Sequence, residues 1–115
     1  MPSFFSRLFA AKPADEAGWI AGEDLAPHLA EALVIDVRGP GEFAGPLGHI
    51  DGARNIPLDV FAGETEALLK HQGPIVLVCH TDRRSSAAAA HLRAAGASDV
   101  TVLRGGMVAW RSEGR

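Results

Sequence analysis

The sequence contains a single cysteine among 115 residues, which excludes an internal disulfide and suits a reducing compartment such as the cytoplasm. It has no apolar run of about 20 residues, so we expect no membrane-spanning helix. The five histidines form no close pair and have no second cysteine to join them, so we expect no metal site. The net charge is −3 and the basic residues are scattered, which argues against a nucleic-acid partner.

The remaining composition is that of an ordinary globular protein. The chain is 47% apolar and 22% charged, and its length suits one domain with its own core. We predict an N-terminal tail over residues 1–17 and a single domain over residues 18–115; the sequence makes no prediction of oligomeric state. The tail has four large apolar residues, Phe4, Phe5, Leu8 and Phe9. They would share one face of a short amphipathic helix, or else the segment is a frayed end.

Glycine and proline divide the domain into short elements. Apolar runs predict strands at residues 19–21, 33–37, 75–79 and 100–103, and the segment 48–57, which is mostly loop, has room for a short strand at 54–56. Helices are predicted from an N-cap at Asp24 to about Glu31, over residues 64–71, from Arg84 or Ser85 to Ala95, and as single turns at 42–44 and up to Trp110. Strands that are apolar without alternation suit a parallel sheet covered on both faces. Their alternation with helices predicts an α/β layered domain.

The most informative segment is the place where the strand at residues 75–79 meets a polar turn and then a helix. Charged residues are costly to bury, so Cys79 should lie at the exit of the strand, where α/β sheets bind ligands. Backbone N–H groups in such a turn stabilise negative charge and favour the thiolate, and Arg83 and Arg84 add positive charge. We predict a reactive cysteine in an anion-binding cradle; the alternative is an inert core cysteine.

Four sequence blocks, taken in order, resemble the single-domain rhodaneses, a family of sulfurtransferases. They are VIDVR at 34–38, GHIDGARNIP at 48–57, IVLVC at 75–79 with RS at 84–85, and VLRGGM at 102–107 with Trp110. The resemblance implies a three-layer α/β domain with a parallel sheet of about five strands flanked by helices. It also implies transfer of a sulfane sulfur from a donor such as thiosulfate to a thiol or cyanide, through a persulfide on Cys79.

The resemblance assigns roles within the loop that follows the strand. Cys79 corresponds to the family's nucleophile, and Arg84 to the arginine that closes the loop and offsets the substrate's negative charge. The substrate-binding loop that it implies consists of His80, Thr81, Asp82, Arg83 and Ser85. Inward-facing N–H groups of residues 80–84 would stabilise the persulfide anion without a general acid.

No cofactor is implied. The expected partners are a small-molecule sulfur donor and a thiol or protein-thiol acceptor, which must come from outside because the chain has no second cysteine.

Supporting roles are expected at positions outside this loop. Asp36 and Arg38 correspond to a pair at a strand end, which we interpret as a hydrogen-bonded clamp, with direct substrate contact as the alternative. His49 lies in a motif that shapes a loop against the sheet. Ser85 and Ser86 are expected to serve the N-terminus of the following helix.

The length of the loop bears on the chemistry. From Cys79 to Arg84 it spans six residues. Phosphatases and arsenate reductases of similar fold have a loop one residue longer, wide enough for a tetrahedral oxyanion, and would need arginine where this chain has Ser85. A sulfurtransferase is therefore favoured over either of them. The alternative from another class is a binding or regulatory module that keeps the fold without turnover.

Asp82 departs from the family pattern, because many members have glycine there. Glycine is convenient if the backbone needs a positive φ, which aspartate tolerates better than most residues. A carboxylate in the loop would disfavour the thiolate and repel anionic donors. Arg83 either pairs with Asp82 or is a solvated surface charge.

Overall fold

A computed structural model describes residues 18–115; the predicted tail and its phenylalanines lie outside the described residues. The predicted α/β architecture is confirmed. One sheet of five parallel strands has the order β1-β5-β4-β2-β3. The strands are Trp19–Ile20 (β1), Leu33–Asp36 (β2), Arg54–Asn55 (β3), Ile75–Val78 (β4) and Val100–Leu103 (β5). All lie where the sequence predicts them, and all but β5 are one residue shorter than predicted.

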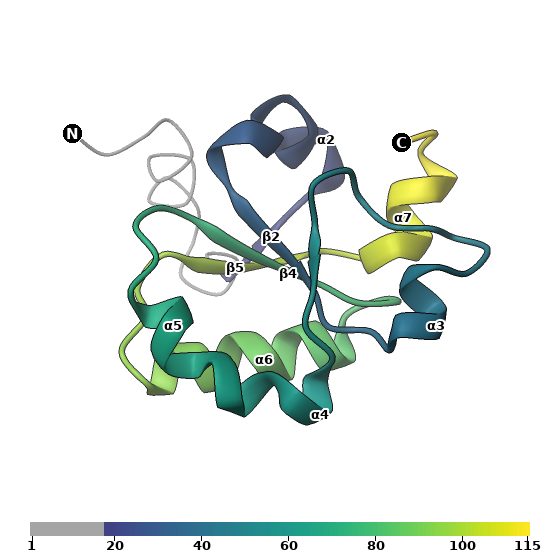
Figure 1. The fold of residues 1–115 in the computed structure, drawn as a ribbon. Helices are drawn as coiled ribbons and strands as arrows, with labels where there is room; N and C mark the ends of the chain where they lie inside the picture. Colours follow the sequence, from purple (N-terminus) through teal and green to yellow (C-terminus); the bar gives the residue numbers. More distant parts are fainter. Residues whose placement is uncertain (1–17) are drawn as a thin grey trace.

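Helices cover both faces of the sheet and make the predicted three layers (Figure 1). The helices on one face are α4 (Leu58–Phe61), α5 (Thr65–Leu69) and α6 (Arg83–Ala94), and those on the other are α2 (Gly22–Leu25) and α7 (Gly106–Ser112). Helix α3 (Pro40–Phe43) follows β2 at the carboxyl end of the sheet. No helix within residues 18–115 is long and apolar enough to cross a membrane.

The central strand β4 explains why both faces need cover. Successive side chains of a strand point to opposite faces, and every residue of β4 is apolar and buried. Ile75 and Leu77 pack in one cluster with Leu92 of α6, whereas Val76 and Val78 pack in a second cluster on the side of α7. The sheet is thus held between two apolar layers, and its strand ends are fixed in position.

Several predicted helix boundaries are wrong, for local reasons. Helix α2 is preceded by Ala21 as N-cap, so Asp24 lies inside its first turn instead of capping it. The α-helix ends at Leu25 because Pro27 lacks the N–H that would continue it, and a 3₁₀ helix, Ala26–Glu31, replaces the predicted continuation.

Three further differences concern the other short helices. Helix α3 begins at Pro40, two residues before the predicted helical turn at 42–44, because proline suits the first turn of a helix. A 3₁₀ helix, Ala62–Glu64, precedes α5, which ends two residues before the predicted end at 71, and the short helix α4 was not predicted. Helix α6 starts at Arg83, one residue earlier than the earlier of the two predicted starts.

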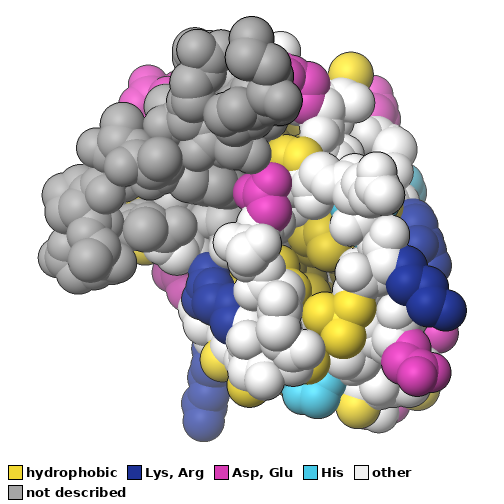
Figure 2. Space-filling view, turned by 90° about the vertical axis from the view of Figure 1, so that its left-hand side faces the viewer, with side chains coloured by type: hydrophobic (Ala, Val, Ile, Leu, Met, Phe, Trp, Pro, Cys, Tyr) yellow, Lys and Arg dark blue, Asp and Glu magenta, His cyan; other side chains and the backbone are white. Residues whose placement is uncertain are grey.

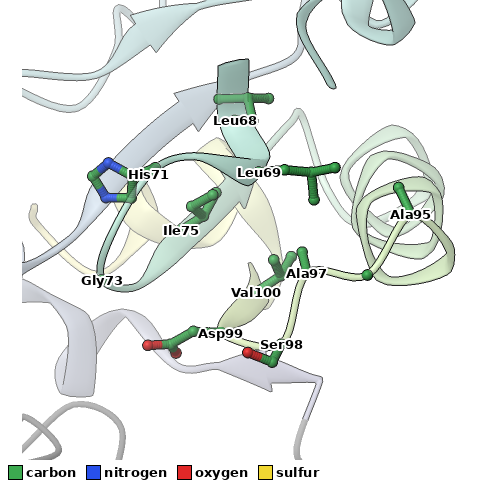
Figure 3. A pocket seen from close by; sticks show the side chains of 11 residues that line it. Leu68, Leu69, His71, Gly73, Ile75, Ala95, Ala97, Ser98, Asp99 and Val100 are labelled. Carbon is green, nitrogen blue, oxygen red and sulfur yellow. The ribbon is translucent and has the colours of Figure 1, made fainter. Parts of the chain in front are cut away.

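A hollow of about 450 Å³ opens at the amino ends of β4 and β5, between α5 and the turn that follows α6. Figure 2 shows apolar side chains gathered in a depression on this side of the molecule. Its lining includes Leu69, Ile75, Ala97 and Val100 (Figure 3). Because Ile75 begins β4 and Cys79 follows its last residue, this hollow lies at the opposite end of the strand from the predicted nucleophile.

Candidate active site

Cys79 begins a tight loop that is fixed by the start of α7. The carbonyl oxygen of Cys79 accepts a hydrogen bond from the Met107 N–H at 2.9 Å, and the carbonyl oxygen of His80 accepts one from the Val108 N–H at 3.1 Å. These N–H groups belong to the first turn of α7, where they have no partner within the helix. The loop backbone therefore supplies the acceptors that the end of α7 needs.

These two bonds determine which way the loop's own N–H groups point. In a trans peptide the C=O of one residue and the N–H of the next point in opposite directions, and the described residues contain no cis peptide. Because the carbonyls of Cys79 and His80 face α7, the N–H groups of His80 and Thr81 face away from it. This orientation is the one that the anion-cradle prediction requires of them.

Gly106 allows the loop and α7 to approach so closely. A Cβ atom on this residue would lie 2.4 Å from the carbonyl oxygen of Cys79, 2.5 Å from that of Thr81 and 2.6 Å from that of His80. Its φ is +55°, a conformation in which glycine has no steric penalty. Position 106 therefore accepts only glycine without displacement of the loop.

The sulfur of Cys79 lies on the floor of the loop. Only 1% of the residue's surface is exposed, and it packs in the core cluster on the side of α6. The Ser85 N–H donates to Sγ at 3.3 Å, and Ser85 Oγ lies 3.2 Å from Sγ. The same hydroxyl donates to the Asp82 carbonyl at 3.1 Å. Two polar groups of one buried serine, its N–H and its hydroxyl, thus meet the sulfur.

Ser85 was predicted to belong to the substrate-binding loop and also to serve the N-terminus of the following helix. The N-cap of α6 is Asp82, and its side chain makes no capping hydrogen bond. Ser85 is the third residue of the helix, and its free first-turn N–H is directed at the sulfur. The N–H that meets the sulfur is therefore that of Ser85, one residue beyond the predicted cradle of residues 80–84.

Replacing Ser85 by alanine should slow attack by Cys79 about tenfold, because it removes the hydroxyl 3.2 Å from Sγ, which can give its one proton to the thiolate in place of the Asp82 carbonyl, while the backbone N–H remains. Stopped-flow measurement of Cys79 alkylation by iodoacetamide across pH would report the effect. Ser86→Ala is the matched control, since Ser86 is exposed on the same helix. Equal rates for the two variants would show that the Ser85 hydroxyl does not act on the sulfur.

Asp36 and Arg38 form the predicted clamp. Arg38 Nε donates to Asp36 Oδ1 at 2.9 Å and Arg38 Nη2 to Oδ2 at 2.7 Å, and both side chains are 1% exposed. The remaining donors of Arg38 reach the carbonyl oxygens of Glu42 at 3.2 Å and Gly48 at 2.6 Å. The guanidinium is therefore used in joining the end of β2 to α3 and the following loop, which supports the clamp over substrate contact.

His49 also has the structural role that was expected of it. Its ring stacks on Phe43 with a centroid separation of 3.7 Å, and its Nδ1 is 2.9 Å from the Phe43 carbonyl oxygen. These contacts hold the loop after α3 against the end of that helix.

Arg84 does not stand free beside the sulfur. Its Nη1 donates to Glu42 Oε1 at 2.7 Å and its Nη2 to Oε2 at 2.9 Å, so the two side chains form a bidentate pair. The pair lowers the pKa of Glu42 from 4.5 to about 2, chiefly through the hydrogen bonds from Arg84. The same bonds raise the pKa of Arg84. Glu42 was not predicted as a functional residue, and nothing in its local sequence indicates this partner.

Removing Arg84 should raise the pKa of Glu42 from about 2 towards its ordinary value of 4.5. The depressed value means that the Glu42 carboxylate stays charged, and the pair intact, until the pH falls through about 2. A ¹³C NMR titration of the Glu42 carboxyl in Arg84→Ala would measure the midpoint. Arg83→Ala should leave the midpoint of the Glu42 titration at about 2, because Arg83 makes no ion pair within residues 18–115. An unchanged midpoint in Arg84→Ala would contradict the pairing.

The other loop residues are exposed, and Asp82 does not use the conformation that glycine would offer. His80, Thr81, Asp82 and Arg83 all lie at the surface. The φ of Asp82 is −134°, so the left-handed backbone considered for this position does not occur. Its Oδ1 accepts a hydrogen bond from the Gly105 N–H at 2.8 Å. The alternative in which Asp82 pairs with Arg83 is not found among the ion pairs of residues 18–115.

Comparison with known proteins agrees with this geometry. The family model of the rhodanese-like domain matches residues 22–113. The thiosulfate sulfurtransferase GlpE of Pseudomonas aeruginosa is 41% identical over 81 residues, which cover 70% of this chain and 71% of GlpE. The uncharacterized protein YqhL of Bacillus subtilis is 39% identical over 88 residues, 76% of this chain and 68% of YqhL. A rhodanese-related protein from Thermoplasma volcanium has a TM-score of 0.75 at 29% identity, over 84% of this chain and 93% of that structure.

Proposed function

Because the chain belongs to the family of rhodanese-like domains, we propose that it is a sulfurtransferase in which Cys79 carries the transferred sulfur. A relative with 41% identity is a thiosulfate sulfurtransferase by name. The observation that carries the proposal is the setting of Sγ, which accepts the Ser85 N–H at 3.3 Å on the floor of a loop whose first two carbonyls face α7. Such a setting stabilises a sulfur anion before and after transfer.

The reaction proceeds in two displacements at sulfur. The Cys79 thiolate attacks the outer sulfur of a sulfane donor, and the donor's S–S bond breaks with its electron pair passing to the leaving group. That group is sulfite if the donor is thiosulfate, or a thiolate if the donor is a persulfide. An acceptor thiolate, or cyanide, then attacks the outer sulfur of the Cys79 persulfide and restores the Cys79 thiolate. No net oxidation occurs and no proton donor is needed.

Burial of Cys79 favours a sulfur atom as the reacting group. With 1% of the residue exposed, only a terminal atom of the donor can reach Sγ without rearrangement of the loop. The new S–S bond, about 2.05 Å long, carries the outer sulfur away from the floor towards the acceptor. The acceptor comes from outside, because Cys79 is the only cysteine of the chain. A reducing compartment such as the cytoplasm would supply small thiols and protein thiols for this step.

The test is turnover with two donors. Wild-type protein should transfer sulfur from a small-thiol persulfide or from thiosulfate to a thiol acceptor. Cys79→Ser should lose at least a thousandfold in rate, because a hydroxyl is not ionised near neutral pH and is a poor nucleophile for sulfur. Cys79→Ala serves as a second variant that leaves no nucleophile. Retention of the wild-type rate by either variant would overturn the proposal.

The second candidate is a binding module without turnover. Two observations favour it: Cys79 is almost wholly buried, and Arg84 is held by Glu42 at 2.7 and 2.9 Å. A module of this kind would fail to transfer sulfur from either donor even though Cys79 remained a free thiol. Titration of the unfolded protein with a thiol reagent establishes that the thiol is free, so the two candidates give different results.

A further inference from the structure

Six charged side chains around the loop, three arginines and three carboxylates, sum to zero charge. Arg38 is paired with Asp36 in the clamp, and Arg84 forms a bidentate pair with Glu42. The loop itself contributes Asp82 and Arg83, both exposed and of opposite sign. The surroundings of Cys79 therefore have no net positive charge with which to attract a doubly charged anion.

Arg84 is the loop arginine that a carboxylate holds, whereas Arg83 is exposed and makes no ion pair within residues 18–115, so the pair with Glu42 decides whether the charge of Arg84 is offered to a donor. Both of its terminal nitrogens donate to Glu42, and the Glu42 side chain is 43% exposed, so this carboxylate is accessible at the surface beside the loop. A dianion could bind the two terminal nitrogens of Arg84 in the same bidentate way only by displacing Glu42. Glu42 would then remain as an unpaired negative charge near the incoming anion.

We propose that Glu42 determines the donor specificity of the site by occupying Arg84. The pair disfavours the dianion thiosulfate and leaves the site to sulfane donors of low charge, namely persulfides of small thiols or of protein thiols. This inference rests on the proposed sulfurtransferase function and narrows its substrate class. Glu42 is here a positioning residue, since it acts through Arg84 and touches no reacting atom.

The carboxylates beside the loop should affect the binding of thiosulfate and of a small-thiol persulfide differently. A thiosulfate whose outer sulfur reaches Sγ would leave its sulfonate group, which becomes sulfite, at the surface of the loop, where the carboxylates of Glu42 and Asp82 would repel it. A persulfide with an uncharged carbon chain meets no such repulsion, and its leaving thiolate carries a single negative charge. The difference should therefore fall on the KM for thiosulfate, with little change in kcat.

The experiment compares wild-type protein with Glu42→Gln in steady-state transfer from thiosulfate and from 2-hydroxyethyl persulfide to a common thiol acceptor. Glutamine keeps an oxygen for the Gly39 N–H, which donates to Glu42 Oε1 at 3.2 Å, but removes the charge. We expect kcat/KM for thiosulfate to rise about tenfold, through KM, and kcat/KM for the persulfide to change less than twofold. Glu42→Ala, which frees Arg84 entirely, should raise thiosulfate use at least as much.

Glu64→Gln is the matched control. It removes one carboxylate from another exposed pair, in which Glu64 Oε1 lies 3.8 Å from Arg54 Nη2. It should leave both donors unchanged, which separates a local effect from one of net charge. Double replacement of Glu42 and Arg84 by glutamine and alanine should abolish the gain, because no guanidinium is then released.

The outcomes separate this inference from the function on which it rests. Persulfide turnover in all variants, with no gain for thiosulfate in Glu42→Gln and Glu42→Ala, would overturn the specificity role and leave the sulfurtransferase intact. An equal gain for both donors would also overturn it, because Glu42 would then act on the nucleophile and not on donor charge. Absence of turnover with both donors in wild type would overturn the function and the inference together.

Discussion

Replacing Gly106 by alanine should destabilise the protein by about 2 to 5 kcal/mol and slow sulfur transfer at least tenfold. The added Cβ would lie 2.4 to 2.6 Å from three carbonyl oxygens of the Cys79 loop, which are backbone atoms that cannot move aside separately. The positive φ of 55° adds a conformational cost. Chemical denaturation measures the first effect and single-turnover persulfide formation the second, because displaced carbonyls carry the opposing N–H groups with them.

Gly52→Ala is the control that separates the cost of the contact with the loop from the cost of the positive φ. Gly52 also has a positive φ, +84°, but no atom lies within 4 Å of the Cβ that alanine would add. It should lose only the conformational part, about 1 to 2 kcal/mol, and keep its rate of sulfur transfer. If both variants lost the same stability and retained activity, the contact between α7 and the loop would have no bearing on the site.

Replacing Arg38 by alanine should cost about 3 to 5 kcal/mol of unfolding free energy, because it leaves the Asp36 carboxylate buried without its partner. Asp36 is 1% exposed and accepts three hydrogen bonds from the Arg38 side chain. The variant also removes the donors to the Glu42 and Gly48 carbonyls. Urea unfolding followed by circular dichroism measures the change.

Arg54→Ala provides the comparison for an exposed pair. Arg54 lies 3.8 Å from Glu64, and both side chains are about half exposed, at 54% and 45%. Surface pairs of this kind contribute under about 1 kcal/mol. A loss below about 1 kcal/mol in Arg38→Ala as well would show that the clamp is not a stabilising element.

The strands were predictable because their signal is local. Four consecutive buried apolar residues in β4 indicate a strand covered on both faces, and this covering is what α6 and α7 provide. The prediction of Cys79 as the nucleophile rests on the same signal, since the polar residues after Cys79 mark the strand's exit. Helix starts were less predictable, because Asp24 offers a capping side chain that the backbone does not use.

The contacts that complete the site are not local, and the sequence gives no sign of them. Glu42 and Arg84 are 42 positions apart and meet only because β2 and β4 are neighbours in the sheet, so that α3 and α6 begin at the same edge. In the sequence, Gly106 belongs to the VLRGGM block at 102–107, which assigns it no role at the site. Its close approach to the Cys79 loop depends on the adjacency of β4 and β5. The pairing of Glu42 with Arg84 and the approach of Gly106 to the loop were missed for the same reason. Both depend on the order of the strands in the sheet, which is a property of the whole fold and not of the local sequence.

The most direct measurement is an intact-protein mass spectrum of the reduced chain before and after incubation with a small-thiol persulfide and, separately, with thiosulfate. We expect a gain of one sulfur atom that is reversed by excess thiol and is absent from Cys79→Ser, with the persulfide reacting more completely than thiosulfate. A protein with a free Cys79 thiol that gained no sulfur from either donor would contradict the assignment of Cys79 as the sulfur carrier.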